Sequence, residues 1–96
     1  MPAAPQDIVT FDDLRPHLSS AAFRYLDLAR AEIRHSIQVG MNRFVHVIGQ
    51  SGHGVYEWIV CGESANGDVI VTHSNFGYGG AATALRDGLN RVLDDA

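Results

Sequence analysis

The sequence predicts a small α+β protein in which one helix precedes and one follows a three-stranded antiparallel sheet, with both helices packed on one face of that sheet. Apolar residues recur at three- and four-residue spacings before Gly40 and again after Gly80, as on the buried side of an amphipathic helix. Three runs rich in β-branched and aromatic residues lie between them, joined by glycine-containing links that are typical of turns. A chain of 96 residues has room for one domain with one core.

The N-terminal part is interpreted in three steps. Residues 1–9 contain two prolines and are expected to form a flexible tail, so the single domain spans residues 10–96. Thr10 with Asp13 three positions later is a capping-box pattern, which predicts one helical turn near 11–15. Pro16 ends that turn because its ring clashes with the carbonyl four residues back, and a longer helix is expected to begin near Ser19 or Ser20.

That longer helix is predicted from a stripe of apolar residues, and Gly40 is a suitable end for it. The stripe consists of Ala22, Tyr25, Leu26, Ala29, Ile33 and Ile37. Strands follow over residues 43–49, 55–61 and 68–73, and Asn66-Gly67 predicts a tight hairpin between the last two. A second helix begins near Ala81. Its Gly88 either weakens the helix by about 1 kcal/mol relative to alanine or lets the helix approach the sheet closely.

Alternation along the strands separates two faces. We assign Trp58 to the face that the helices cover, together with Phe44, His46 and Ile48. The opposite face is then partly solvated or used for contact, unless the first helix or the N-terminal tail folds over it. An exposed apolar patch is a common contact surface. The predicted interaction surface consists of Val45, Val47, Ile59 and Ile70.

Composition limits the function classes. The net charge is −4 and every basic residue is an arginine, which argues against tight binding to a phosphate backbone. No apolar run reaches the roughly 20 residues that cross a bilayer. The N-terminus lacks the basic start and apolar stretch of a secretory signal, and Cys61 is the only cysteine, so we expect a cytoplasmic protein with no membrane partner.

The reactive side chains do not form a recognisable catalytic or metal-binding pattern. The five histidines lack the spacings of zinc sites. Cys61 lies in a strand with Glu57 as its neighbour on the same face, which disfavours a thiolate nucleophile. We therefore expect no catalytic residue, metal or cofactor. Gly79 and Gly80 precede a helix and can present backbone N–H groups to an anion, so they are candidate anion-binding residues.

Two resemblances bear on the fold. Trp58 is followed by Asn66-Gly67, by Val69-Ile70, and then by Thr72, Ser74, Tyr78, Ala82, Gly88 and Val92. In this pattern the chain from Trp58 onward resembles a family of small uncharacterised bacterial proteins built from strand-strand-helix units. That family has no assigned activity, so the resemblance implies the fold alone.

The predicted order of elements over residues 19–93 is also similar to that of a double-stranded-RNA-binding domain. That family places a basic Lys-Lys-x-Ala-Lys segment at the start of its second helix, where it holds phosphates. Residues 79–83 here read Gly-Gly-Ala-Ala-Thr and carry no charge. We therefore expect weak RNA binding or none.

The sequence thus predicts a non-enzymatic interaction module that forms a homodimer or binds another protein. Its contact surface is either the Val45, Val47, Ile59 and Ile70 face or the edge of the first strand. Two alternatives stay open. One is nucleic-acid binding through the sheet or the arginines of the first helix, and the other is a small-ligand protein or enzyme that uses the glycine-rich loops.

Overall fold

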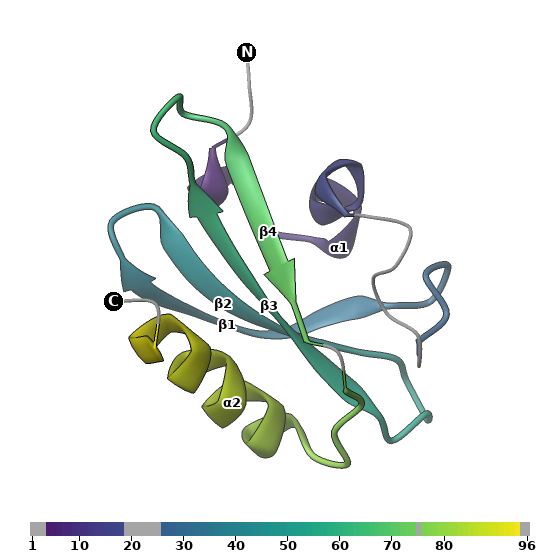
Figure 1. The fold of residues 1–96 in the computed structure, drawn as a ribbon. Helices are drawn as coiled ribbons and strands as arrows, with labels where there is room; N and C mark the ends of the chain where they lie inside the picture. Colours follow the sequence, from purple (N-terminus) through teal and green to yellow (C-terminus); the bar gives the residue numbers. More distant parts are fainter. Residues whose placement is uncertain (1–3, 19–25, 75, 95–96) are drawn as a thin grey trace.

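The computed structural model describes residues 4–18, 26–74 and 76–94 (Figure 1). A four-stranded antiparallel sheet in the order β1-β2-β3-β4 lies between a C-terminal helix and an N-terminal segment of short helical turns. In chain order the elements are the 3-10 turn η1 (Pro5–Asp7), α1 (Phe11–Leu14), the 3-10 turn η2 (Arg15–His17), β1 (Glu32–Gly40), β2 (Arg43–Gly49), β3 (Tyr56–Glu63), β4 (Val69–His73) and α2 (Ala81–Asp94).

The predicted first helix is wrong over its second half, where Glu32–Gly40 forms β1, and the sheet has four strands, not three. The first part of that predicted helix, residues 19–25, lies outside the described residues. Ile33 and Ile37 are four residues apart, which suits a helix, but both also alternate with Val39 at the two-residue period of a strand. All three are β-branched and therefore favour a strand. Asn42, at φ 57°, then turns the chain so that Gly40 pairs with Arg43.

The helix-strand-strand-strand-helix order that suggested an RNA-binding domain is therefore not the order of this chain. The later predictions agree with the structure: β2, β3 and β4 lie close to their predicted ranges, and α2 begins at Ala81. In the β3–β4 connection Gly67 has φ 84° and donates its N–H to the Ser64 carbonyl over 2.9 Å. Glycine suits that position because a side chain disfavours positive φ.

The two sheet faces are covered by different segments, so the helices do not share one face as predicted. On one face α2 packs across β1, β2 and β3, with Ala84, Gly88 and Val92 buried. A Cβ at Gly88 would lie 2.8 Å from Val45 Cγ1 and 3.1 Å from Trp58 Cβ. Of the two interpretations of Gly88, close approach of the helix to the sheet is thus confirmed.

The N-terminal segment covers the other face. Pro5, Ile8, Phe11 and Leu14 are buried there, so the part of the predicted flexible tail that the structure describes is packed into the core. The core cluster on this face consists of Ile8, Phe11, Leu14, Leu26, Ala31, Ile48, Ile59 and Cys61. The predicted cap is confirmed, since Thr10 Oγ1 accepts from the Asp13 N–H and the Asp13 carboxylate accepts from the Thr10 N–H. These backbone donors, with that of Val9, hold the pKa of Asp13 below its usual value.

The sequence-based assignment of faces is also corrected. Val47 pairs directly with Trp58, and Val45 pairs with Val60, so Trp58 shares its face with Val45 and Val47. His46 and His73 do share a face, as expected, because both pair with Ile59, but it is the face opposite to Trp58. Alternation fixes the faces within one strand, whereas the register between strands depends on the connecting loop, and an offset of one residue exchanges the faces.

Candidate functional site

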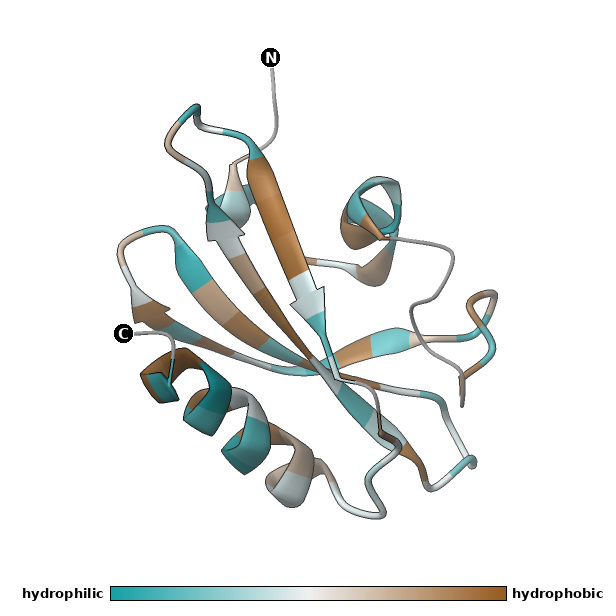
Figure 2. Ribbon diagram, viewed as in Figure 1, coloured by the Kyte–Doolittle hydropathy of each residue, from teal (hydrophilic) through white to brown (hydrophobic). Residues whose placement is uncertain are grey.

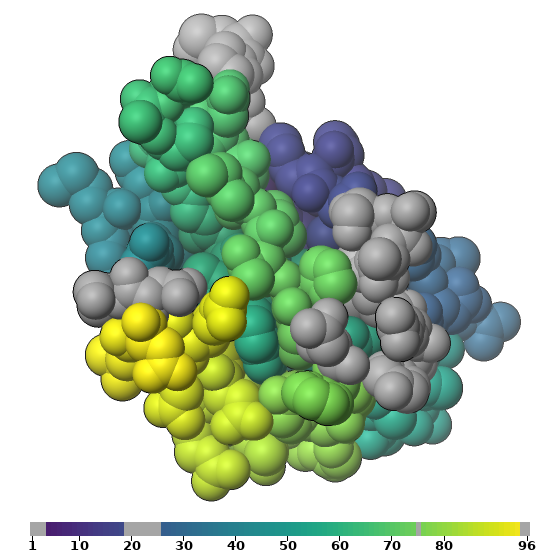
Figure 3. Space-filling model, viewed as in Figure 1, coloured from purple at the N-terminus to yellow at the C-terminus, as the bar shows by residue number. Residues whose placement is uncertain are grey.

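A groove between β4 and α2 is lined by aromatic and polar side chains. The helix packs on β1, β2 and β3 and leaves the same face of β4 uncovered, where Ile70 is 50% exposed. The resulting hollow has a volume of about 360 Å³, and it lies between the yellow helix and the green strand in Figure 3. Thr72 and His73 of β4 form one of its walls.

Three aromatic residues line one end of this groove: Trp58, Phe76 and Tyr78. Tyr78 is held beside β3 by two backbone hydrogen bonds of 2.8 Å with Tyr56. Its hydroxyl oxygen accepts a hydrogen bond of 3.3 Å from Trp58 Nε1 and interacts with the Asp87 carboxylate. Burial raises the pKa of Tyr78, the Trp58 N–H lowers it, and Asp87 raises it again. The end of the groove is therefore built from rings whose positions are fixed by hydrogen bonds.

Ser74 fixes the third aromatic residue at the mouth of the groove. The Ser74 N–H donates to the Trp58 carbonyl over 3.0 Å, and Ser74 Oγ accepts from the Trp58 N–H over 3.2 Å. The same hydroxyl donates to the Phe76 carbonyl over 3.3 Å. This bond holds the backbone at Phe76, whose side chain lies at the surface with the residue 67% exposed.

The helix wall of the groove is polar. Asp87, Asn90, Arg91 and Asp94 line it, and their spacing of three, four and seven residues places them on one side of α2. Figure 2 shows the contrast between these hydrophilic residues and the hydrophobic strand β4. Sequence reasoning followed only the apolar stripe of this helix. The signal for the site was a polar stripe that lies beside the apolar one rather than opposite to it.

The groove continues along β4 into a second, smaller hollow of about 110 Å³. Thr72 lines both hollows. The second is lined by Ile70, Val60 and Val92 together with Arg43 and Glu63. The combined groove thus has an aromatic end and an aliphatic end, and it runs beside the edge strand.

The two edge strands of the sheet differ in how well they can accept another strand. Edge strands are commonly protected by bulges and charged residues. The ladder of β1 is interrupted between Ile33 and His35 and again between Gln38 and Gly40, and the strand carries Glu32 and Arg34. β4 pairs with β3 in continuous register and reads Val-Ile-Val-Thr-His. Judged on the described residues alone, it is the less protected edge.

The backbone groups on the outer side of β4 can be assigned. The Ser64 N–H donates to the Asp68 carbonyl, and the Ser74 N–H donates to the Trp58 carbonyl. Hydrogen-bonded and non-hydrogen-bonded pairs alternate in an antiparallel ladder, so Ile70 and Thr72 bond to β3. Val69 and Val71 consequently direct their N–H and C=O groups away from the sheet.

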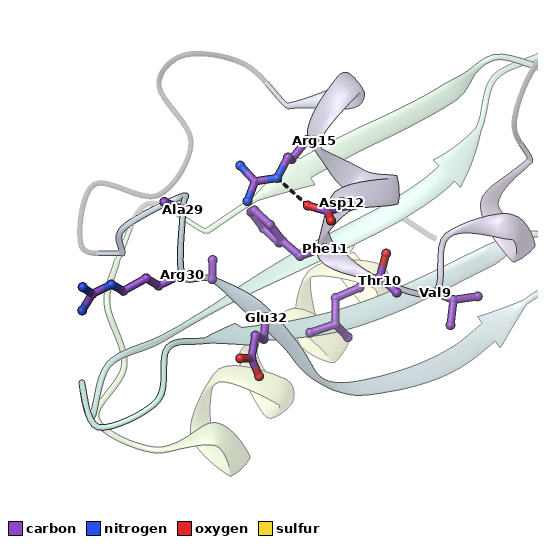
Figure 4. Close-up of a pocket in the computed structure, with 10 residues that line it drawn as sticks. Val9, Thr10, Phe11, Asp12, Arg15, Ala29, Arg30 and Glu32 are labelled. Atoms are coloured by element: carbon purple, nitrogen blue, oxygen red, sulfur yellow. Dashed lines mark hydrogen bonds and ion pairs between the residues drawn. The ribbon is translucent and has the colours of Figure 1, made fainter.

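A separate hollow of about 410 Å³ lies between the N-terminal segment and the start of β1 (Figure 4). Arg15 lies over it, but its guanidinium group already has three partners within the chain. Its Nε bonds Asp12 Oδ1 at 2.8 Å, a terminal nitrogen donates to the Leu28 carbonyl at 2.6 Å, and its guanidinium carbon lies 5.0 Å from the Phe11 ring centre. Arg30 points away from this hollow in Figure 4. These contacts join the N-terminal segment to β1 and leave little chemistry for a ligand.

The structure does not bring the predicted contact residues together. Val45 and Val47 are fully buried under α2, and Ile59 is fully buried under the N-terminal segment on the opposite face. Ile70 remains half exposed, beside the groove. Only Ile70 of the four is therefore accessible within one chain. Gly79 and Gly80 precede α2 as predicted, and the Gly80 carbonyl accepts from the Ala84 N–H; a role for them in anion binding stays a prediction.

Two further reactive groups lie on the face opposite to the groove. His46 is buried, its Nδ1 lies 2.7 Å from Ser36 Oγ, and its ring stacks on Phe44. Among the described residues Nε2 of His46 has no hydrogen-bond partner, and burial lowers the pKa of this imidazole. Cys61 is buried as a free thiol, and burial raises its pKa to about 11. Both groups are kept neutral at physiological pH.

Within the ranges 4–18, 26–74 and 76–94, no cluster of three or more His, Cys, Asp or Glu side chains has the arrangement to hold a metal ion. None of the helices in those ranges is long and apolar enough to span a membrane. Comparisons of the chain with protein-family models, with curated proteins and with solved structures find no match.

Proposed function

We propose that this protein is a non-enzymatic interaction module that binds an extended segment of a partner polypeptide along β4. The observation that supports this most directly is the combination of the less protected sheet edge with a groove beside it. In binding by strand addition, main-chain hydrogen bonds provide affinity and pockets for alternate side chains provide specificity. Here Val69 and Val71 supply the outward backbone groups, and the hollows on the α2 side supply the pockets.

The length of β4 favours a short segment over a second copy of the whole chain. Five residues span roughly 16 Å at the rise of a strand. A ladder of that length buries far less than the ~1,200 Å² of a stable interface between folded proteins. A flexible segment can enter the groove and reach surface that a second folded copy, held away by α2, does not. We place this activity in the cytoplasm because the single cysteine is a free, buried thiol.

The test is a selection of random peptides displayed on phage against the whole chain, followed by NMR with the synthesised peptides. Binding along β4 should shift the amide signals of Val69 and Val71 and the indole signal of Trp58. Because Trp58 is the only tryptophan and lines the groove, its fluorescence should change as well.

A matched pair of variants locates the binding surface. Phe76 and Leu93 are 67% and 70% exposed, so neither Phe76→Ala nor Leu93→Ala should change the melting temperature. Phe76 lines the groove and Leu93 does not, so only Phe76→Ala should weaken peptide binding. The proposal is overturned if no peptide is enriched, if the shifts fall on β1 or the N-terminal hollow, or if light scattering shows a dimer whose formation broadens the β4 signals.

A further inference from the structure

We infer that the aromatic end of the groove receives a cationic side chain, lysine or arginine, of the bound segment. This inference rests on the proposed function, because it names the kind of segment that the same groove would select. It depends on the chemistry of two walls that meet there: rings from β3 and the loop before α2, and carboxylates from α2 itself.

The first wall consists of the three aromatic rings of Trp58, Phe76 and Tyr78. The face of an aromatic ring carries partial negative charge and attracts cations. Phe76, with 67% of its surface exposed, is the most accessible of the three rings, whereas Trp58 is buried with 8% exposed. Hydrogen bonds hold Trp58 and Tyr78 against each other, and Ser74 holds the backbone at Phe76. Little ordering of side chains is then required when a ligand binds, and preorganisation of this kind strengthens binding.

The second wall carries two carboxylates. Asp87 and Asp94 are seven residues apart on α2, which corresponds to about 10 Å along the helix axis. Asp87 interacts with the Tyr78 hydroxyl, so one carboxylate lies directly at the aromatic end. An ammonium or guanidinium group placed there meets aromatic side chains and carboxylate oxygens together, whereas a carboxylate of a partner would be repelled.

The cations already present do not neutralise this wall. Arg91 is the one arginine among the described residues that line the hollow, against two aspartates, so these three side chains together carry an excess of one negative charge. Arg86 approaches Asp87 with an Nε–Oδ1 distance of 3.8 Å, but it does not line the groove and it is largely exposed. A surface ion pair of that kind contributes little and leaves Asp87 able to accept a bond from a ligand.

The test begins with the peptides selected above, which should share a lysine or arginine at one position. Replacing that residue by acetyl-lysine or citrulline, which keep the shape and remove the charge, should weaken binding at least tenfold, measured by Trp58 fluorescence. On the protein side, Asp87→Asn and Asp94→Asn should each weaken the cationic peptide severalfold and leave the neutral peptide unchanged. Asp68→Asn is the control, since Asp68 is exposed in the β3–β4 turn outside the groove.

A further variant tests whether binding depends on the aromatic ring of Phe76 or only on its apolar surface. Phe76→Leu keeps an apolar side chain and removes the aromatic face, so it should weaken the cationic peptide and leave the neutral peptide unchanged. If selected peptides bind at β4 without a preference for lysine or arginine, or if neutral and cationic versions respond equally to Asp94→Asn, the inference is wrong while the proposed function stands. If no peptide binds at β4, the proposed function itself has failed.

Discussion

The two faces of the sheet are covered by chain of very different regularity. One face is covered by α2, a single helix held at close range by Gly88 against Val45 and Trp58. The other is covered by η1, α1 and η2, three turns of only three or four residues each, whose buried residues Pro5, Ile8, Phe11 and Leu14 recur every three positions. Val45 and Val47 are fully buried on the helix face, whereas the N-terminal face also encloses the polar side chains of His46 and Glu57. The long helix shows an apolar stripe over several turns and was predicted, whereas each short turn contributes one or two buried residues, too few for a stripe to be recognised within one element.

The largest effect should come from a charge placed under the N-terminal segment. Ile59 is fully buried there, and an unpaired charge in such a place costs several kcal/mol. This is comparable to the ~5 kcal/mol that a small domain has available, so Ile59→Glu should be unfolded by circular dichroism. Ile70→Glu, at a half-exposed position of the same sheet, should retain its cooperative melting. An Ile59→Glu chain that melts like wild type would show that the N-terminal segment does not cover this face.

A smaller effect should come from filling the close contact on the helix face. The methyl group of Gly88→Ala would meet Val45 and Trp58 at 2.8 and 3.1 Å. Overpacking of this kind costs about 1–3 kcal/mol and should outweigh the gain of about 1 kcal/mol in helix propensity. Urea unfolding should therefore show a lower stability. Gly79→Ala, where a Cβ meets nothing within 4 Å, is the control and should be neutral or slightly stabilising. A stabilised Gly88→Ala would mean that close packing does not fix α2.

The smallest effect should be a pH dependence that belongs to the N-terminal face alone. Burial lowers the pKa of His46, so the unfolded chain binds a proton at a higher pH than the folded chain does. The stability that the neutral imidazole contributes is present above the unfolded pKa of about 6.5 and is lost as the pH falls from there towards the folded value. The slope for one proton is at most about 1.4 kcal/mol per pH unit.

His46→Phe should remove this slope between pH 7 and 5.5, as measured by urea unfolding at several pH values. It should also keep the stacking on Phe44. A wild-type protein whose stability is constant over that range would contradict the burial of a neutral histidine under the N-terminal segment.

The parts of the fold that could be predicted from the sequence are those marked by a short, local pattern of residues. The Thr10–Asp13 cap, the three strands after Asn42 and the helix after Gly80 each carry their own pattern of residues. A helix was wrongly predicted in place of β1 because the spacing of Ile33 and Ile37 fits a helical and an extended period equally well. Only the pairing with β2 decides between them. The assignment of residues to the two sheet faces was wrong because the loop of residues 50–55 sets the register between β2 and β3. The conformation of that loop has no local signature in the sequence.

Part of the candidate site could be predicted from the sequence. Trp58, Tyr78 and Ile70 were each singled out in the sequence, the first two in a shared pattern and the last as a contact residue. Their meeting with Asp87 and Asp94 depends on where α2 crosses the sheet. That crossing follows from long-range packing at Gly88, which a single sequence indicates only as an option.

The buried thiol of Cys61 has a practical consequence for following the groove in solution. With a pKa of about 11 against an ordinary 9.0, its reactive thiolate is about a hundredfold scarcer at neutral pH than that of an exposed cysteine. A cysteine introduced at Asp68 or at Asn90 should then accept a dye or spin label while the native one stays silent. Distances across the groove can then be measured without replacing Cys61, so the core packing around that cysteine stays unchanged.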